Sequence, residues 1–336
     1  ELPELKLLVD SVQASKFITR KKSMELISKI EKLTSRENAK KLQRQVFITN
    51  RVKTFNEQIY YNVDKIHEAI AENKQITFKY FNLDVNKKKA VGEALDIYQG
   101  APFHSPAIVR AGEYEDATDS DIVIITCGLA RKPGMTRLDL AKTNVAIIKD
   151  VAKSIVPYAP NAKYVIVSNP VDVLTYAFTK FSGIPEERII GSGTILDTAR
   201  LRARISEYYR VNQQNIHAYV LGEHGDTAVV PWSIANISNV PVEDYGNSLK
   251  NNDGFYPEFK KNEVEDFVRK SGGRVIRRKG ATYYAVSMSV CHLCKCLLSG
   301  MDTTLTVSTM LNGEYGIDDV CLSLLNIVGN KGAHSK

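Results

Sequence analysis

The chain has 336 residues, of which 43% are hydrophobic and 25% are charged, with a net charge of +7. This composition excludes a disordered chain, a collagen-like chain and a disulfide-rich secreted scaffold. No apolar run reaches the roughly 18 residues that a membrane helix needs, so we expect no membrane association. Five Cys and the absence of a basic-then-apolar leader favour a cytoplasmic location.

Composition changes abruptly after the first quarter of the chain. The first 91 residues contain no Gly, and all 20 glycines lie at or beyond Gly92. Residues 1–90 carry 19 basic and 11 acidic residues, whereas the remaining residues carry 26 and 27, so the whole positive excess belongs to the first quarter. We therefore predict two segments of different origin, joined between about Tyr80 and Ala90.

The first segment is predicted to begin with a helix and to continue as mixed structure. The expected elements are a helix at 23–33, a strand at 44–49, a helix at 63–73 and a strand at 75–83. The basic residues between Lys16 and Lys53 could contact nucleic-acid phosphates, but a solvated face is the favoured explanation. We therefore do not expect nucleic acid as a partner.

Two long stretches of the first segment carry a family resemblance. They are LLVDSVQASKFITRKKSMELISKIEKL and RQVFITNRVKTFNEQIYYNVDKIHEAIAENKQITFKYF. With them, residues 4–83 resemble a fragment of the WYL-domain transcriptional regulators. It covers the stretch after the DNA-binding winged helix and the first strands of the ligand-sensing barrel. Neither the helix that reads DNA nor the Trp-Tyr-Leu motif is present, so the resemblance implies a regulator fragment without either working end.

The second segment alternates predicted strands and helices. The expected strands are 121–126, 164–170, 216–222, 305–311 and 320–328, and the expected helices are 140–156, 172–181, 194–209, 263–272 and 281–300. Short, continuously apolar strands such as DIVIIT are typical of a parallel sheet covered on both faces. The order predicts an α/β fold with a parallel sheet and an appended α/β domain.

Three motifs of this segment carry side chains suited to one reaction. GEHGD, residues 222–226, places His224 between two glycines in a tight turn, although a lone His is more often structural. LDTARLR, residues 196–202, puts Asp197 and Arg200 on one helix face, where an ordinary ion pair is the simpler explanation. GLARKPGMTR, residues 128–137, is typical of a mobile basic loop. Together they could orient a protonated imidazole, bind a carboxylate and polarise a carbonyl, as hydride transfer to a 2-oxo acid requires.

In this order the motifs resemble the L-lactate dehydrogenases of the lactate/malate dehydrogenase family. The resemblance covers nearly all of residues 84–330 and also rests on DVNKKKAVGEALD, VSNPVDVLTY, KGATYYA and YGIDDVCLS. It implies NAD as cofactor and a small 2-hydroxy or 2-oxo acid as substrate. The implied catalytic residues are His224 as proton donor and acceptor, Asp197 as its partner and Arg137 at the carbonyl. The implied substrate-binding residues are Arg200 at the carboxylate, Asn169, Arg131 and Thr282.

The same resemblance implies where the cofactor and an effector bind. The implied cofactor-binding residues are Asp84 at the adenosine ribose, Lys89, Gly128, Val167 and Asn169. Arg202 and His217 match the pair that binds fructose 1,6-bisphosphate in allosteric bacterial members, and a homotetramer is implied with it. Arg131 stands where lactate enzymes usually have Gln and malate enzymes have Arg, whereas GEHGD favours lactate. We therefore expect lactate, with malate as the alternative.

One element of the family pattern is absent. The family opens with a strand, a GxGxxG turn and a helix that bring backbone N–H groups to the pyrophosphate, but no glycine precedes Gly92. We therefore expect an incomplete Rossmann-type sheet, divided into a regulator-like fragment (1–83), a partial NAD-binding domain (84–170) and a catalytic domain (171–336). A fusion of two genes would give this arrangement, and the alternative function is a regulator fragment without enzymatic activity.

The stretch CHLCKC, residues 291–296, could suggest a metal site. Cys291 and Cys294 have the spacing of a CxxC pair, but the sequence offers no second pair and the stretch lies in an apolar helix. Buried small hydrophobic side chains explain it better, so we expect no metal.

Overall fold

A computed structural model describes most of the second segment and little of the first. It covers residues 20–32, 87–100, 108–129, 137–249 and 259–335, together with Leu5, Leu8, Val9, Val12 and Thr34. The contacts divide the chain into two compact units, one of residues 1–78 with 91–110 and one of residues 79–90 with 111–336. Each unit is described by itself.

The first unit contains helix α2, Arg20–Glu31, and most of helix α5, Lys87–Gln99. Helix α2 confirms the helix expected at 23–33, although it begins and ends slightly earlier. It buries Ile27 against Val9 in a small apolar cluster. Helix α5 was not predicted. The strands expected at 44–49 and 75–83 and the helix expected at 63–73 lie outside the described residues.

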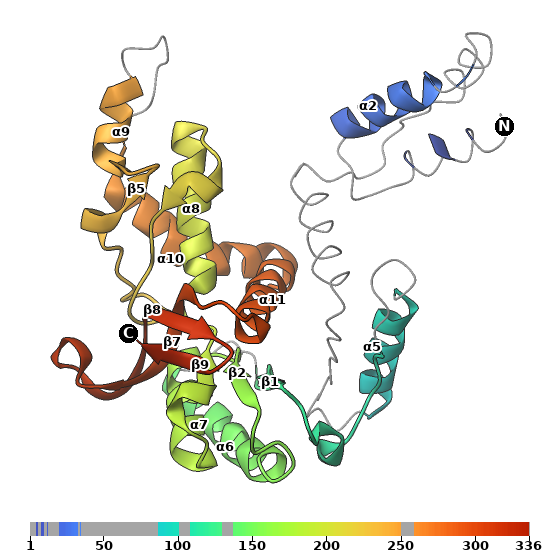
Figure 1. The fold of residues 1–336 in the computed structure, drawn as a ribbon, viewed down its shortest axis with the longest axis vertical. Helices are drawn as coiled ribbons and strands as arrows, with labels where there is room; N and C mark the ends of the chain where they lie inside the picture. The colour runs from blue at the N-terminus through green and yellow to red at the C-terminus, as the bar shows by residue number, and fades with distance from the viewer. Residues whose placement is uncertain are drawn as a thin grey trace. The chain divides into compact units, whose positions relative to one another are not determined.

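The second unit is built on one six-stranded sheet in the order β1-β2-β3-β7-β8-β9 (Figure 1). The first three strands are parallel, and from β3 onward each strand is antiparallel to its neighbour. The strands are β1 Ile122–Ile125, β2 Lys163–Ile166, β3 Ile189–Gly191, β7 Thr303–Asn312, β8 Asp318–Gly329 and β9 Gly332–Ser335. The expected α/β fold with a parallel sheet is therefore confirmed, although β3 and β9 were missed.

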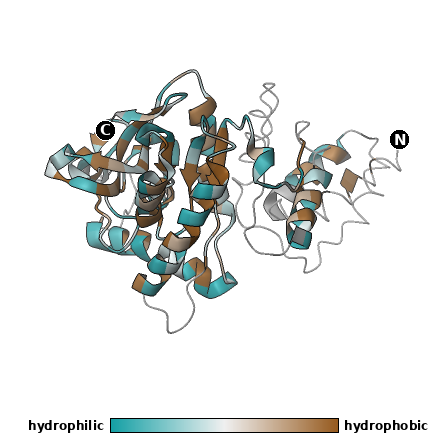
Figure 2. Cartoon of the chain, turned by 90° about the horizontal axis from the view of Figure 1, so that it is seen from below, coloured by the Kyte–Doolittle hydropathy of each residue, from teal (hydrophilic) through white to brown (hydrophobic). Residues whose placement is uncertain are grey.

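Helices cover both faces of this sheet, as its apolar strands require. Helices α6, Arg137–Ile155, and α7, Val171–Ser182, pack on one face, where Tyr164 and Phe178 are completely buried (Figure 1). Helix α11, Tyr284–Leu298, packs on the other face through Leu293 and Leu297. In Figure 2 the helices of this unit carry both hydrophobic and hydrophilic residues along their length, as helices with one buried face should.

A second core surrounds helix α8, Ile195–Tyr209. Helix α8 buries Leu201, Ile205 and Tyr209 against helix α10, Lys261–Lys279, and against a small sheet. That sheet consists of β4 Ile216–His217, β5 Asn236–Ile237 and β6 Val240–Pro241, and helix α9 spans Val242–Leu249. Short 3-10 helices lie at Tyr114–Ala117, Glu186–Arg188, Gln213–Asn215, Trp232–Ile234 and Glu314–Gly316.

The strand expected at 216–222 is wrong beyond His217. The chain leaves the small sheet there and next makes isolated bridges, one between Leu221 and Val229 and one between Gly222 and Ser323. Residues 218–222 therefore connect the small sheet to the large sheet, where Gly222 pairs with Ser323 of β8. No helix in the described parts of the chain combines the length and apolarity that crossing a membrane would require.

The buried face of α7 gives a stability prediction. Phe178 is completely buried, with its ring centroid 4.9 Å from that of Tyr164. We expect Phe178→Ala to lower the free energy of unfolding by about 3–5 kcal/mol, because the substitution removes buried apolar area and leaves a cavity. Phe181→Ala is the matched control on the same helix, because this ring is 43% exposed. Urea unfolding followed by circular dichroism measures both variants, and equal losses would contradict the assigned core.

Candidate functional site

The ends of two neighbouring parallel strands meet at one edge of the sheet. After β1 the chain passes through Cys127, Gly128 and Leu129, and after β2 it passes through Val167, Ser168 and Asn169 before α7 begins. Ser168 Oγ donates a hydrogen bond of 2.5 Å to the Cys127 carbonyl. In this class of fold, ligands bind beyond the carboxyl ends of the parallel strands.

Asn144 of α6 ties the two strand ends together. Its side chain is almost completely buried and accepts a hydrogen bond from the Leu129 N–H at 2.8 Å. Its Nδ2 donates to the carbonyls of Leu129, at 3.2 Å, and of Asn169, at 2.8 Å. Sequence reasoning did not single out Asn144, because an Asn inside a predicted helix is usually exposed. As a result, the exposed Gly128 and Asn169 are held at the same edge.

Asp197 and Arg200 lie on one face of α8, as their spacing predicts. Arg200 Nη1 lies 2.8 Å from Asp197 Oδ1, and the two side chains are only 17% and 10% exposed. Burial makes this more than a surface pair, because an unpaired charge here would be costly.

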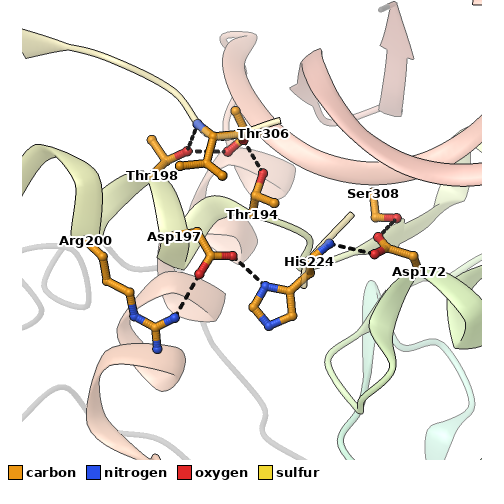
Figure 3. A network of polar contacts seen from close by, with 9 residues as sticks. Asp172, Thr194, Asp197, Thr198, Arg200, His224, Thr306 and Ser308 are labelled. Carbon is orange, nitrogen blue, oxygen red and sulfur yellow. Dashed lines mark hydrogen bonds and ion pairs between the residues drawn. The ribbon is translucent and has the colours of Figure 1, made fainter. Parts of the chain in front are cut away.

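His224 lies at the tip of the GEHGD turn, close to that pair (Figure 3). Its Nδ1 lies 2.5 Å from Asp197 Oδ2, so the two carboxylate oxygens serve two different partners. Gly222 enters the turn at φ +86°, which favours glycine, and exchanges two backbone hydrogen bonds with Ser323 of β8. The predicted association of His224, Asp197 and Arg200 is therefore present in one cluster.

A second carboxylate touches the same histidine and was missed. Asp172, in the first turn of α7, accepts a hydrogen bond from the His224 backbone N–H at 2.8 Å. Its other oxygen accepts one from Ser308 Oγ of β7 at 2.6 Å. The sequence signal was an acidic residue two positions after Pro170 in VSNPVDVLTY, but nothing in the sequence alone indicated which residue it would contact.

Hydroxyl groups fix the chain that leads into the turn. Thr198 Oγ1 accepts a hydrogen bond from the Val220 N–H at 3.0 Å and shares one of 3.1 Å with Thr306 Oγ1 (Figure 3). Thr194 Oγ1 donates to the Val220 carbonyl at 2.5 Å. Both polar groups of Val220 are thereby bonded to α8 or the residue that precedes it, so the turn is held at a set distance from Asp197.

Charge and burial shift the pKa values of Asp197 and His224 in opposite directions. Burial pushes the pKa of Asp197 upward, but its hydrogen bond to His224 and the charges of His224 and Arg200 outweigh burial and leave the pKa below its ordinary value. Burial lowers the pKa of His224, but the hydrogen bond to Asp197 and the charges of Asp197 and Asp172 leave it above its ordinary value. An imidazole in this site therefore binds a proton more tightly than a free one.

The remaining predicted site residues differ in burial, and some lie outside the described residues. Thr282 is half-buried just before α11, Val167 is half-buried after β2, and Lys89 is exposed on α5. Arg137 is the first residue of α6. Asp84 and Arg131 lie outside the described residues, as does most of the predicted loop 128–137.

Arg202 and His217 lie on α8 and β4, two elements that pack around the second core. Arg202 Nε donates to the carbonyl of Ala218 at 3.1 Å, and its guanidinium stacks 5.1 Å from the Tyr219 ring centre. Burial lowers the pKa of Arg202. His217 is exposed on β4, directly before Ala218.

The cysteines of the stretch 291–296 lie on α11. Burial raises the pKa of Cys294 to about 12 and also raises that of Cys291. Where side chains are described, no three His, Cys, Asp or Glu residues gather in a way that could hold a metal ion.

Comparisons with known proteins identify the family of the chain. The model of the lactate/malate dehydrogenase NAD-binding domain matches residues 65–191, and that of the alpha/beta C-terminal domain of the same family matches residues 194–335. L-lactate dehydrogenase 1 of Clostridium acetobutylicum is 47% identical over 251 residues, which are 74% of this chain and 79% of that protein. L-lactate dehydrogenase of Acetivibrio thermocellus is 44% identical over 250 residues, or 74% of this chain and 78% of that protein.

A solved structure also matches the fold. It is that of MGS-M5, a lactate dehydrogenase from a Medee basin deep-sea metagenome library, with a TM-score of 0.72 and 36% sequence identity. The match covers 82% of this chain and 85% of that one.

The shifted pKa values of the pair give a pH prediction. The lowered pKa of Asp197 adds stability that is present above its ordinary value of 3.8 and is lost as pH falls through the folded value. The raised pKa of His224 adds stability that is present below its ordinary value of 6.5 and is lost as pH rises through the folded value. The pair therefore stabilises most between these two ordinary values.

We expect Asp197→Asn to remove this contribution. The loss in unfolding free energy should be on the order of 3 kcal/mol inside the window, because Asn leaves the buried cations uncompensated, and smaller at alkaline pH. Urea unfolding at one pH inside the window and at one alkaline pH measures the difference between the two losses. The control is Asp266→Asn, because the Asp266 carboxylate forms an exposed ion pair with Lys270. A loss that does not vary with pH would contradict the assigned charge states.

Proposed function

The chain belongs to the lactate/malate dehydrogenase family and is of the NAD-dependent L-lactate dehydrogenase type, and we propose that the cluster around His224 performs the proton transfer between lactate and pyruvate. The observation that carries the proposal is one carboxylate, Asp197, bound at once to His224 and Arg200. The relatives reported above are L-lactate dehydrogenases by name, so the malate alternative suggested by Arg131 is not favoured.

His224 would give its proton to the substrate oxygen when pyruvate is reduced. Asp197 occupies Nδ1, so Nε2 is the nitrogen that faces substrate. Burial opposes a charge on the His224 ring, but the hydrogen bond and charge of Asp197 raise its pKa and so favour the protonated ring until the proton leaves. In the reverse direction the neutral ring accepts the hydroxyl proton of lactate. NAD, when bound, supplies or takes up the hydride.

The remaining substrate contacts follow from charge. Arg200 uses Nη1 for Asp197, and a guanidinium has five N–H donors, so it keeps donors for two parallel hydrogen bonds to the substrate carboxylate. Arg137 would polarise the substrate carbonyl. Asn169, Thr282 and Arg131 would complete the pocket, with Asn169 contacting both substrate and nicotinamide.

The described residues suit the nicotinamide end of NAD. The exposed Asn169 amide and the exposed Gly128 backbone follow adjacent strands, and Val167 offers an apolar contact. A ring with a carboxamide fits such donors and acceptors. Lys89 and Asp84 would serve the adenosine end, but residues 1–91 hold no glycine to form the turn that normally receives the diphosphate.

We propose that residues 1–83 come from a WYL-type regulator fused to the dehydrogenase part. The proposal is supported by the absence of glycine, by the charge excess, and by pairwise alignments that leave about a quarter of the chain outside them. The NAD-binding-domain match reaches back to residue 65, so residues 65–83 are where the two assignments overlap. The division into 84–170 and 171–336 follows from the same proposal. A regulator fragment without enzymatic activity is the competing function.

Further proposals concern assembly and regulation. We propose a cytoplasmic homotetramer in which Arg202 and His217 bind fructose 1,6-bisphosphate. The half-buried Arg202, bonded to the carbonyl next to His217, supports a shared anion site.

The missing glycine turn predicts weak cofactor binding. Asp84 and Asn169 could each add roughly 0.5–1.5 kcal/mol, whereas micromolar affinity needs about 8 kcal/mol. We therefore expect titration calorimetry of the purified chain with NADH to show no low-micromolar binding. Low-micromolar affinity would show that residues 44–83 replace the lost turn.

A grafted chain tests the catalytic half separately. In it, residues 1–83 are replaced by the glycine-bearing strand-turn-helix-strand of an intact lactate enzyme, and pyruvate reduction should then appear. In this background we expect His224→Ala to lower kcat/KM by about 10²–10⁴-fold, because the proton donor is lost.

His334→Ala is the matched control for that variant, because His334 lies in β9 and forms an ion pair with Asp302 at 3.4 Å. Spectrophotometric NADH oxidation measures both. Unchanged turnover in His224→Ala would remove His224 from the mechanism, and a graft that binds NADH without any turnover would contradict the assigned catalytic half.

A further inference from the structure

A run of cations without any acidic residue begins in the middle of α10. Residues 267–301 hold seven Lys or Arg and no Asp or Glu. Arg269 and Lys270 form ion pairs with Glu265 and Asp266, one turn earlier. The other cations of this run on α10, which we call the basic rim, are Arg274, Arg277, Arg278 and Lys279. The structure gives these four no ion pair with any described residue.

The basic rim begins beside the residue assigned to the substrate carboxylate. A Cβ atom at Gly272 of α10 would lie 3.7 Å from Arg200 Nη2 and 3.8 Å from Arg200 Nη1, so the Arg200 guanidinium packs against this turn of the helix. At the next residue, Gly273, a Cβ atom would lie 3.9 Å from Arg277 Nη1, so the Arg277 side chain runs back along the helix towards the same turn. Thr282, another proposed substrate contact, follows the end of the rim by three residues.

We propose that the basic rim guides the carboxylate of the substrate from solution towards Arg200. This inference rests on the proposed function, in which Arg200 binds the carboxylate of a 2-oxo acid. Arg277, Arg278 and Lys279 are exposed, so their charges act through solvent on an approaching anion. A group of like charges concentrates small ions of the opposite sign nearby and raises their rate of association.

Aromatic rings hold parts of the rim in place without neutralising it. Lys279 Nζ lies 4.3 Å from the ring centre of Tyr284 and 5.1 Å from that of Tyr283. The Arg274 guanidinium lies 4.9 Å from the ring centre of Phe267. A cation over a ring keeps its full charge, whereas a carboxylate partner would cancel it. The positive charge of the rim is therefore retained.

A simpler explanation concerns the helix alone. Arg277, Arg278 and Lys279 lie in the last turn of α10, where the helix dipole favours cations. On that explanation, loss of the charges would lower stability without changing how fast an anion reaches the site. The approach of an anion to the site therefore decides between the two explanations.

Alkylation of His224 in the full chain measures this approach. The His224 side chain is 26% exposed and its Nδ1 is bound to Asp197, so Nε2 is the nitrogen that displaces iodide from a reagent. Iodoacetate carries a carboxylate, whereas iodoacetamide is neutral and of nearly the same size. The ratio of the iodoacetate rate to the iodoacetamide rate, followed by mass spectrometry of the His224 peptide, isolates the effect of the charge. It is measured at about 10 mM salt, where charges act over about 30 Å.

We expect the double variant Arg277→Gln, Arg278→Gln to lower this rate ratio about threefold, because two charges that attract the anion are lost. The difference should disappear near 1 M salt, where the screening length falls to about 3 Å. The matched control is Lys153→Gln with Lys163→Gln. Lys153 lies in the last turn of α6 and Lys163 at the amino end of β2, opposite to the end that leads to Asn169. An unchanged ratio in the double variant, or an equal fall in the control, would overturn the proposal.

The unmodified chain gives a second readout that depends on no variant. The rate ratio at His224 should fall as salt is added, and more steeply than the ratio at His334 of β9. Equal salt dependence at the two histidines would also overturn the proposal. Alkylation needs neither NAD nor turnover, so a failure here is distinct from an absence of pyruvate reduction in the grafted chain.

Discussion

The site depends on one carboxylate that is shared between two cations. Asp197 gives one oxygen to Arg200 at 2.8 Å and the other to His224 at 2.5 Å, and it is almost completely buried. A buried charge is tolerated only when partners compensate it, so the imidazole of His224, the guanidinium of Arg200 and the carboxylate of Asp197 stabilise one another. Its place in the first turn of α8 adds the favourable helix dipole.

The large sheet makes this sharing possible by bringing distant segments together. The GEHGD turn is pinned to β8 through Gly222 and Ser323, while α8 is pinned to β7 through Thr198 and Thr306. Since β7 and β8 are neighbouring strands, these two sets of hydrogen bonds restrict the distance between Asp197 and His224. The C-terminal strands β7 and β8 therefore position Asp197 and His224 through hydrogen bonds to the elements that carry them.

Sequence patterns predicted the elements whose periodicity is strong. DIVIIT and the helix at 194–209 were located within two residues, because burial on both faces of a strand or one face of a helix leaves a clear pattern. Strand β3 has only three residues, and the sequence of β9, GAHS, lacks the apolar run that marks β1, so both were missed. The strand expected at 216–222 was overextended because its apolar residues serve a crossing segment instead of a sheet.

The site was predictable to the extent that its residues share a motif or resemble a family. Asp197 and Arg200 could be paired from helical spacing alone, but the contact of either with His224 depends on chain packing that spacing does not show. Asn144 and Asp172 form hydrogen bonds with the backbone groups of Asn169 and His224. Every residue type has these backbone groups, so the bonded motif shows no particular side chain that would point to the contact. Such residues become visible only when the hydrogen bonds are known.

The two halves of the reaction place unequal demands on this chain. Substrate chemistry needs a few side chains at fixed distances, and α7, α8 and the GEHGD turn supply them from within residues 170–226. Dinucleotide binding instead uses the backbone N–H groups of a glycine turn at a helix N-terminus. A segment without glycine can therefore precede an intact cluster of His224, Asp197 and Arg200, because folding of this cluster depends on β2, β3 and the C-terminal strands, to which it is hydrogen-bonded or adjacent.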